Sequence, residues 1–200
     1  MSITVYGDSI SGNCLKVKWV AEKLGIPYRW VEVSVLSGET RTPDFLARNP
    51  AGQVPAIVFE DGRTLAQSNA IILHLAEDSE LIPADRYERA RMLEWMFWEQ
   101  YSHEPYIAVA RFQMAYLGKA RDQLEARLYE RGAAALDRME QALGSGRFLV
   151  GDRPTLADVA LVAYTRVAHE GGFDLSRWPA IQAWISRVEA ALDIDAAPGA

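Results

Sequence analysis

The 200-residue chain contains little cysteine and little histidine, and this limits the chemistry that it can carry. Cys14 is the only cysteine, so the chain can form neither an internal disulfide nor a cysteine zinc site. The three histidines, His74, His103 and His169, lie far apart and lack the paired spacing of metal ligands. We therefore expect no bound metal.

Long hydrophobic runs and clusters of positive charge are also absent. No apolar run approaches the roughly 20 residues that a transmembrane helix needs. The first residues, MSITVYGDS, lack the basic and apolar parts of a signal peptide. With 21 basic and 27 acidic residues the net charge is −6, and no basic cluster favours nucleic-acid binding. We expect a cytoplasmic protein that binds neither membranes nor nucleic acids.

The composition is that of a globular protein, with 50% hydrophobic and 24% charged residues. The first third alternates between strand and helix patterns, with strands expected at 3–6, 28–35, 54–59 and 63–66 and helices at 13–24, 43–48 and 67–77. A βαβ crossover predicts parallel pairing, and the Asp61-Gly62 turn predicts an antiparallel hairpin. This part of the chain therefore predicts a small mixed sheet flanked by helices.

The remainder of the chain shows helical patterns and no strand. We expect a long helix over 87–117, bent near Pro105 because proline cannot donate the helical hydrogen bond. Further helices are expected over 121–143, over 155–168 and around 181–188, followed by a loose tail at 193–200. Most aromatic residues of the long helix should lie in the core: Trp95, Phe97, Trp98, Tyr101, Tyr106, Phe112 and Tyr116. The chain thus predicts a mixed α/β domain at 1–79 and an all-helical domain at 87–200.

The segment 151–160 (GDRPTLADVA) contains a capping-box pattern. Thr155 can cap the helix that follows, and Asp158 can reach back to it, an arrangement worth about 1 kcal/mol. The apolar run after it is typical of a buried helix. We assign this segment a structural role and no chemistry.

The Val54-Pro55 step is the first feature that can bind a ligand. Pro55 opens a strand but has no N–H to donate to the sheet. If the bond is cis, the N–H and C=O of Val54 turn outward and can pair with an extended ligand. The alternative is a trans proline at an edge strand, since X-Pro statistics alone put cis at about 5%.

Two helix starts offer further polar groups. The segment 67–71 (QSNAI) opens a helix whose first N–H groups and dipole favour an anion, and Ser68 can donate its hydroxyl to a carboxylate there. Ser9, Ser11 and Asn13 precede or begin the first helix, at the carboxyl end of a strand, where open α/β sheets bind ligands. The alternative for the serines is simple helix capping. The alternative for Cys14 is a small buried residue, which we favour.

Taken together, these segments resemble the cytosolic glutathione S-transferases. The segments that carry the resemblance occur in the family's order: 11–17 (SGNCLKV), Gln53-Val54-Pro55, 67–71 (QSNAI) and 151–160 (GDRPTLADVA). The resemblance implies a thioredoxin-like N-terminal domain and an all-helical C-terminal domain. It also implies that glutathione is a co-substrate and that no separate cofactor is bound.

Site residues follow from the resemblance only where positions match. It implies that the Val54-Pro55 bond is cis and that the Val54 backbone holds the cysteinyl part of glutathione. It also implies that Gln67 and Ser68 hold the γ-glutamyl part. It further implies that Ser11 meets the thiol, while Asn13 stands about where cysteine-type members have their cysteine and is the second catalytic candidate. The family's usual glutamate is Gln67 here, which weakens pairing with the ligand's α-amino group.

Further residues are candidates for contacts with the two substrates. Arg41 and Gln53 are candidates for the glycyl end of glutathione, and Tyr106, Arg111 and Phe112 are candidates for contacts with an apolar electrophile. The resemblance implies a detoxification enzyme that holds glutathione as a thiolate for attack on that electrophile. A hydroxyl donor and a helix N-terminus near the sulfur would favour the anion.

Two other functions stay open. One is a glutathione-dependent disulfide or peroxide reductase, for which Asn13 and the lack of a catalytic tyrosine give some support. A reductase with an internal disulfide is excluded by the single cysteine. The other is a non-catalytic module of the same fold that binds ligands. The family also implies a homodimer, with Phe59 and Arg63 as contact candidates.

Overall fold

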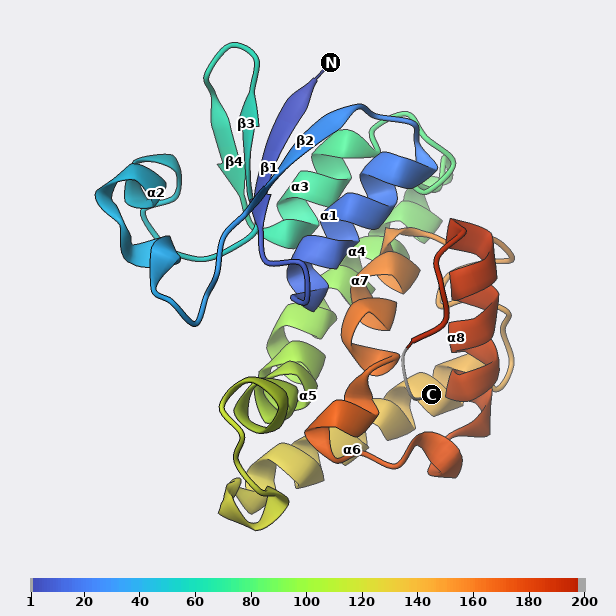
Figure 1. Cartoon of the computed structure of the whole chain (residues 1–200). Coiled ribbons are helices and arrows are strands. Elements are labelled where there is room, and N and C mark those ends of the chain that lie inside the picture. Colours follow the sequence, from blue (N-terminus) through green and yellow to red (C-terminus); the bar gives the residue numbers. More distant parts are fainter. Residues whose placement is uncertain (1, 198–200) are drawn as a thin grey trace. The chain divides into compact units, whose positions relative to one another are not determined.

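The computed structural model describes residues 2–197 and divides after Ser79 into two compact units, Met1–Ser79 and Glu80–Ala200 (Figure 1). The first unit is built around a β-sheet. The described part of the second unit consists of helices and turns and contains no strand. The expected fold class, a thioredoxin-like α/β unit followed by an all-helical one, is confirmed.

Four strands form the sheet of the first unit: β1 (Ile3–Gly7), β2 (Tyr28–Glu32), β3 (Ala56–Phe59) and β4 (Thr64–Ala66). Their order across the sheet is β2-β1-β3-β4. β1 and β2 run parallel, whereas the β1–β3 and β3–β4 pairs are antiparallel, as the crossover and the hairpin predicted. β2 and β3 are shorter than expected, because residues 33–35 and the Val54-Pro55 step lie outside the sheet ladder.

Three α-helices flank this sheet: α1 (Gly12–Lys23), α2 (Pro43–Arg48) and α3 (Ser68–Leu75). α1 and α3 pack together on one face, and α2 lies on the opposite face (Figure 1). Successive side chains of a strand point to opposite faces. Tyr6 packs against the buried cluster that includes Phe45 of α2, so its neighbour Val5, which is fully buried, faces the α1–α3 side. The loop after β1 therefore leads directly into the helix that covers one face of the sheet.

The second unit contains five α-helices among its described residues: α4 (Arg86–Trp98), α5 (Glu104–Arg111), α6 (Ala126–Leu143), α7 (Leu156–Thr165) and α8 (Pro179–Leu192). Short π-helical segments at Glu99–His103 and Phe112–Tyr116 follow α4 and α5. The long helix expected over 87–117 changes type near Pro105, because the first π-helical segment ends just before it. A proline cannot donate the next α-helical hydrogen bond, so the register changes there.

Two helix boundaries in this unit differ from expectation. The helix expected over 121–143 begins only at Ala126, because Leu124 and Glu125 have extended backbone conformations after a 3-10 turn. The helix expected over 155–168 ends at Thr165, and a separate 3-10 turn begins at Ala168. The amphipathic pattern continues through both boundaries, which is why the sequence did not mark them.

The expectation that most aromatic residues of the long helix fill the core is wrong. Of the seven, only Trp95 is buried. Phe97 and Tyr101 are 72% and 83% exposed, and the other four are half-buried. The core positions of this stretch are occupied instead by residues such as Met92 and Ile107, which are fully buried.

The described part of the expected tail is held in place. The backbone oxygen of Asp195 accepts a hydrogen bond from the Arg166 guanidinium, and Ala197 is buried. Arg166 also pairs with Glu189 of α8, with 3.2 Å between Nε and Oε1. A loose tail is therefore wrong for residues 193–197, and residues 198–200 lie outside the described residues.

The expected capping box at the start of α7 is present and forms part of a larger buried network. The Thr155 N–H donates to Asp158 at 2.8 Å. Asp158 is fully buried and also accepts hydrogen bonds from the Leu149 N–H at 3.0 Å and from the Trp184 indole N–H at 2.8 Å. Burial raises the pKa of Asp158, while the surrounding donors oppose that rise. One carboxyl group thus joins α7 to α8 and to the chain before α7.

The Asp158→Asn variant should lose about 1.5–3 kcal/mol of unfolding free energy, measured by urea denaturation. The change keeps the side-chain shape but places an NH₂ group against donors, either those of Thr155 or those of Leu149 and Trp184. Asp152→Asn, at an exposed carboxyl nearby, is the control and should change stability by less than about 0.5 kcal/mol. Equal stability of Asp158→Asn and the parent chain would refute the role of the network.

Candidate functional site

The loop between β1 and α1 is organised by Asp8, which is buried. Its Oδ1 accepts from the Ile10 N–H at 3.1 Å, and its backbone oxygen accepts from the Ser11 N–H at 3.0 Å. Ser11 is the N-cap residue of α1, yet its side chain makes no capping hydrogen bond. Its hydroxyl instead acts on the Cys14 thiol, whose pKa it lowers. The Ser11 hydroxyl therefore does not cap α1.

Cys14 is fully buried, as the sequence predicted. Its sulfur accepts a hydrogen bond from the Asp8 N–H at 3.4 Å. Burial raises the pKa of the thiol from 9.0 to about 12, although the hydrogen bonds from Ser11 and Asp8 oppose the rise. The thiolate is the reactive form of cysteine. At neutral pH Cys14 is therefore a thiol and a poor nucleophile.

Asn13 connects the start of α1 to the start of α3. Its Oδ1 accepts a hydrogen bond from the Ser68 hydroxyl at 3.0 Å and another from the Lys16 ammonium at 2.8 Å. Ser68 is only 5% exposed, and Lys16 is fully buried. The fold thus brings into direct contact two predicted site residues, Asn13 and Ser68, that are 55 positions apart.

Lys16 is a site residue that the sequence reasoning missed. It lies four residues after Gly12 and three or four before Trp19 and Val20, all of which are buried. A lysine on the buried stripe of a helix is unusual, because lysine is almost never fully buried unless it is paired. That helical spacing was the signal available in the sequence.

The Val54-Pro55 peptide bond is cis, as predicted. The Val54 side chain packs against a buried cluster of Val33, Phe45 and Ala56. Within residues 2–197, neither the N–H nor the C=O of Val54 forms a hydrogen bond with the protein. Backbone groups in this state are suited to pairing with an extended peptide-like ligand.

Gln67, the residue before α3, has an unusual backbone conformation with φ 71° and ψ 111°. A non-glycine residue with positive φ is strained by about 1–3 kcal/mol, and such residues cluster at binding sites. The Gln67 side chain makes no capping hydrogen bond to α3 and is exposed. Gln67 is therefore a strained, exposed residue directly before the buried Ser68, as is typical of a binding site.

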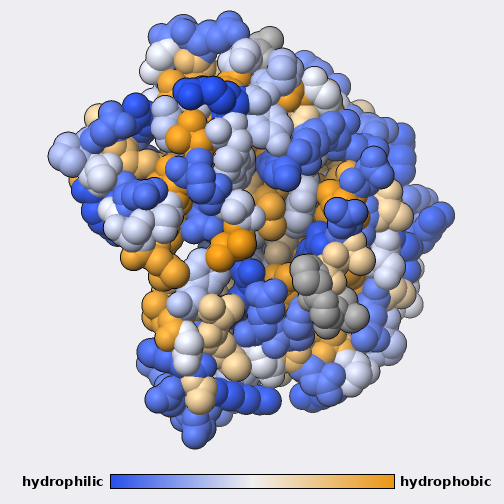
Figure 2. Space-filling view, viewed as in Figure 1, coloured by the Kyte–Doolittle hydropathy of each residue, from blue (hydrophilic) through white to orange (hydrophobic). Residues whose placement is uncertain are grey.

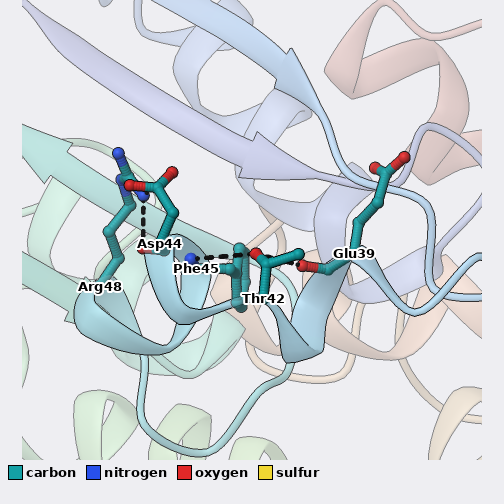
Figure 3. Close-up of polar contacts among 5 residues, drawn as sticks. All are labelled: Glu39, Thr42, Asp44, Phe45 and Arg48. Atoms are coloured by element: carbon teal, nitrogen blue, oxygen red, sulfur yellow. Dashed lines mark hydrogen bonds and ion pairs between the residues drawn. The ribbon is translucent and has the colours of Figure 1, made fainter.

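The segment that leads into α2 is fixed by short-range hydrogen bonds (Figure 3). The Thr42 hydroxyl donates to the Glu39 carbonyl at 2.9 Å and accepts from the Phe45 N–H at 3.3 Å. Arg48 forms an ion pair with Asp44 one turn earlier. Phe45 is buried in the cluster beneath α2, so this segment is anchored to the sheet.

Arg41 and Gln53, the two predicted glycyl-end residues, lie on adjoining loops. The Arg41 Nη1 donates to the Ala51 carbonyl at 3.3 Å, and the Gln53 carbonyl accepts from the Asn49 amide at 2.7 Å. Between them Gly52 has φ 62°, and a Cβ there would lie 2.4 Å from Arg41 Nη1. The positive φ favours glycine there, and any larger residue would displace the Arg41 side chain. Both predicted side chains are exposed.

The candidates for electrophile contacts belong to the second unit. Tyr106 and Phe112 are half-buried, on α5 and just after it. Arg111 is 8% exposed, and its Nε lies 2.6 Å from Glu170 Oε2. Its guanidinium also lies 5.6 Å from the ring centre of Tyr116. Arg111 therefore helps to hold α5 against the turn at 168–171.

Residues 2–197 contain no group of three or more histidine, cysteine or acidic side chains that could hold a metal ion. Over the same residues, none of the helices combines the length and the hydropathy needed to cross a membrane. The face shown in Figure 2 is mostly hydrophilic, with several separate hydrophobic areas.

Comparison with known proteins matches both units. The glutathione S-transferase N-terminal domain model matches residues 10–78, and the C-terminal domain model matches residues 122–187. A maleylacetoacetate isomerase from Rhizobium meliloti is 35% identical, covering 86% of this chain and 84% of the relative. The chain belongs to the glutathione S-transferase family. Glutathione S-transferase 3 of Zea mays is 31% identical, covering 94% and 89% of the two chains.

Solved structures of the family agree with the fold. A glutathione S-transferase from Pseudomonas fluorescens is 50% identical, covers 94% of each chain and superposes with a TM-score of 0.91. A glutathione transferase homologue from Sulfitobacter, solved with bound glutathione, is 25% identical, covers 94% and 93% of the two chains and has a TM-score of 0.81. As a member of this family, the chain is an enzyme of the glutathione S-transferase class.

The raised pKa of Cys14 predicts a pH dependence of stability. Between about pH 9 and 12 the unfolded chain loses the thiol proton while the folded chain keeps it, so stability falls as pH rises. The parent chain should therefore lose about 1.4 kcal/mol more than Cys14→Ala between pH 8 and 10, measured by urea unfolding. Tyr28, whose pKa is also raised to about 12, acts in the same direction in both proteins and cancels in the difference.

An equal loss in the two proteins would contradict the raised pKa. A thiol that is alkylated rapidly in the folded chain at neutral pH would contradict it as well, because the buried thiol should react far more slowly than free cysteine.

Proposed function

We propose that this glutathione S-transferase binds glutathione in its first unit and activates the bound thiol for attack on an apolar electrophile. The observation that carries the proposal is the contact between Asn13 and Ser68, residues from the two predicted ligand segments. Val54, with its unpaired backbone N–H and C=O, completes the set. Glutathione acts as a co-substrate, and the reaction uses no other cofactor.

Each part of glutathione has a proposed partner in the first unit. The Val54 backbone pairs with the cysteinyl residue in the manner of a short antiparallel strand. Ser68 and Gln67 bind the γ-glutamyl end at the start of α3, where helix N–H groups favour a carboxylate. Arg41 and Gln53 bind the glycyl carboxylate, and both have exposed side chains.

Ser11 is the proposed donor to the sulfur of glutathione, with Asn13 as the second catalytic candidate. The Ser11 hydroxyl already lowers the pKa of one nearby thiol, that of Cys14, so its position suits such a bond. A donor to the anion lowers the pKa of the bound thiol, which raises the thiolate fraction at neutral pH. Ser11 stays protonated, and the glutathione sulfur is the nucleophile.

The remaining expectations are part of the same proposal. Tyr106, Arg111 and Phe112 contact the electrophile, whose apolar body is held near the thiolate. The enzyme acts in detoxification in the cytoplasm as a homodimer, with Phe59 and Arg63 at the contact between subunits. The Arg63 guanidinium lies 5.7 Å from the Phe59 ring centre, so the two side chains form one surface feature.

A reductase function is not favoured, because Cys14 is buried and its pKa is raised to about 12. The 35% identity to the Rhizobium meliloti relative favours one second candidate, the isomerisation of maleylacetoacetate. Parallel assays on an aryl halide and on maleylacetoacetate distinguish the two activities. Glutathione binding without turnover of any electrophile would favour a non-catalytic module.

Two serine variants should separate binding from activation. Ser68→Ala should weaken glutathione binding about tenfold in calorimetry, because it removes a hydrogen bond to a charged group. Ser11→Ala should instead raise the pKa of bound glutathione, followed by thiolate absorbance, and lower conjugation of an aryl halide about tenfold. Ser37→Ala, at an exposed serine after β2, is the control and should match the parent chain.

Parent-like affinity of Ser68→Ala would remove Ser68 from the site. Loss of turnover in Cys14→Ala with normal turnover in Ser11→Ala would reverse the assignment of the loop and favour the reductase.

A further inference from the structure

The Lys16 side chain does more than fill the core beneath α1. It is fully buried, and its ammonium donates to Asn13 Oδ1 at 2.8 Å from one helical turn away. An ammonium carries donors and no acceptor, so the Asn13 atom that faces it must be the oxygen. Lys16 thereby determines which way the Asn13 amide points, and the NH₂ group is turned away from Lys16.

The same oxygen also receives the hydroxyl proton of Ser68, at 3.0 Å. A serine hydroxyl has one proton to donate. A ligand carboxylate only accepts, so Ser68 can donate to it only by turning its proton away from Asn13. Binding of a carboxylate at Ser68 therefore removes one of the donors to Asn13 Oδ1.

A polar atom that loses its partner away from bulk water destabilises the structure, whereas one that keeps a charged donor does not. Asn13 is half-buried, and Lys16 belongs to the same helix, so its hydrogen bond does not depend on the ligand. Lys16 can hold the Asn13 amide in place while Ser68 changes partner. Without Lys16, the Asn13 oxygen would compete with the ligand for the Ser68 proton.

We propose that Lys16 is a positioning residue, which acts through Asn13 to keep the Ser68 hydroxyl available to the ligand carboxylate. This inference rests on the proposed function, since the carboxylate is taken to be the γ-glutamyl end of glutathione. It links both proposed ends of the site, because Asn13 also lies beside the loop proposed to meet the thiol. Lys16 itself touches no ligand.

A double-mutant cycle tests this role. Lys16→Met, Asn13→Ala and the double variant are compared with the parent chain in calorimetric titration with glutathione, after thermal unfolding has shown that each is folded. Lys16→Met alone should weaken binding about tenfold, the size of a lost charge-assisted hydrogen bond. In the Asn13→Ala background the same change should weaken binding less than twofold, since the residue through which Lys16 acts is gone.

Two further variants make the result specific. Lys18→Met removes a half-exposed lysine of the same helix that pairs with Glu22, and it should bind glutathione like the parent chain. Lys16→Gln keeps a neutral donor and should recover part of the lost affinity. If Lys16→Met does not fold, the cycle is run with Lys16→Gln, with the same sign expected and a smaller effect.

Parent-like affinity of Lys16→Met, or equal losses with and without Asn13, overturns the positioning role. A parent chain that binds no glutathione overturns the proposed function instead, so the two failures are distinguishable.

Discussion

One side-chain oxygen, that of Asn13, connects the fold of the first unit to its candidate site. It receives a donor from α1 and a donor from α3, the two helices that cover one face of the sheet. Any change that moves these helices apart therefore also moves the residues proposed to hold the ligand. Two of the proposed ligand segments are thus joined directly by the Asn13–Ser68 hydrogen bond.

The second unit uses the same physical device for a different purpose. The Asp158 carboxyl is fully buried and collects donors from Leu149, Thr155 and Trp184, which lie on separate segments. Both carboxyl oxygens of Asp158 accept hydrogen bonds from the protein, so this network joins structural elements and takes no part in the proposed ligand site. At Asn13, by contrast, one of the donors is a serine hydroxyl that can change partner.

Much of this arrangement was readable from the sequence because its signals are local. Strand and helix periods, the Asp61-Gly62 turn and the capping box at Thr155 all depend on neighbouring residues. The cis Val54-Pro55 bond was instead expected from the family resemblance, because local statistics alone favour trans. The structure also brings together Asn13 and Ser68, which the sequence assigned to two separate ligand segments.

What the sequence did not reveal depends on distant contacts. Lys16 lies on the buried stripe of α1, which packs against α3, and its helical spacing was a signal that a lysine there would normally argue against. The exposure of Phe97 and Tyr101 was missed because helical spacing is the same on a core face and on a solvent face. The late start of α6 was missed because the extended backbone at Leu124 interrupts no hydrophobic pattern.

A crystal structure of the chain with glutathione bound tests the central claim most directly. The account predicts that the cysteinyl backbone pairs with Val54, that the γ-glutamyl carboxylate accepts the Ser68 hydroxyl and that Ser11 is the hydroxyl nearest the sulfur. Asn13 should keep its hydrogen bond to Lys16 in that complex. Glutathione bound elsewhere, or joined to Cys14 through a mixed disulfide, would contradict the account.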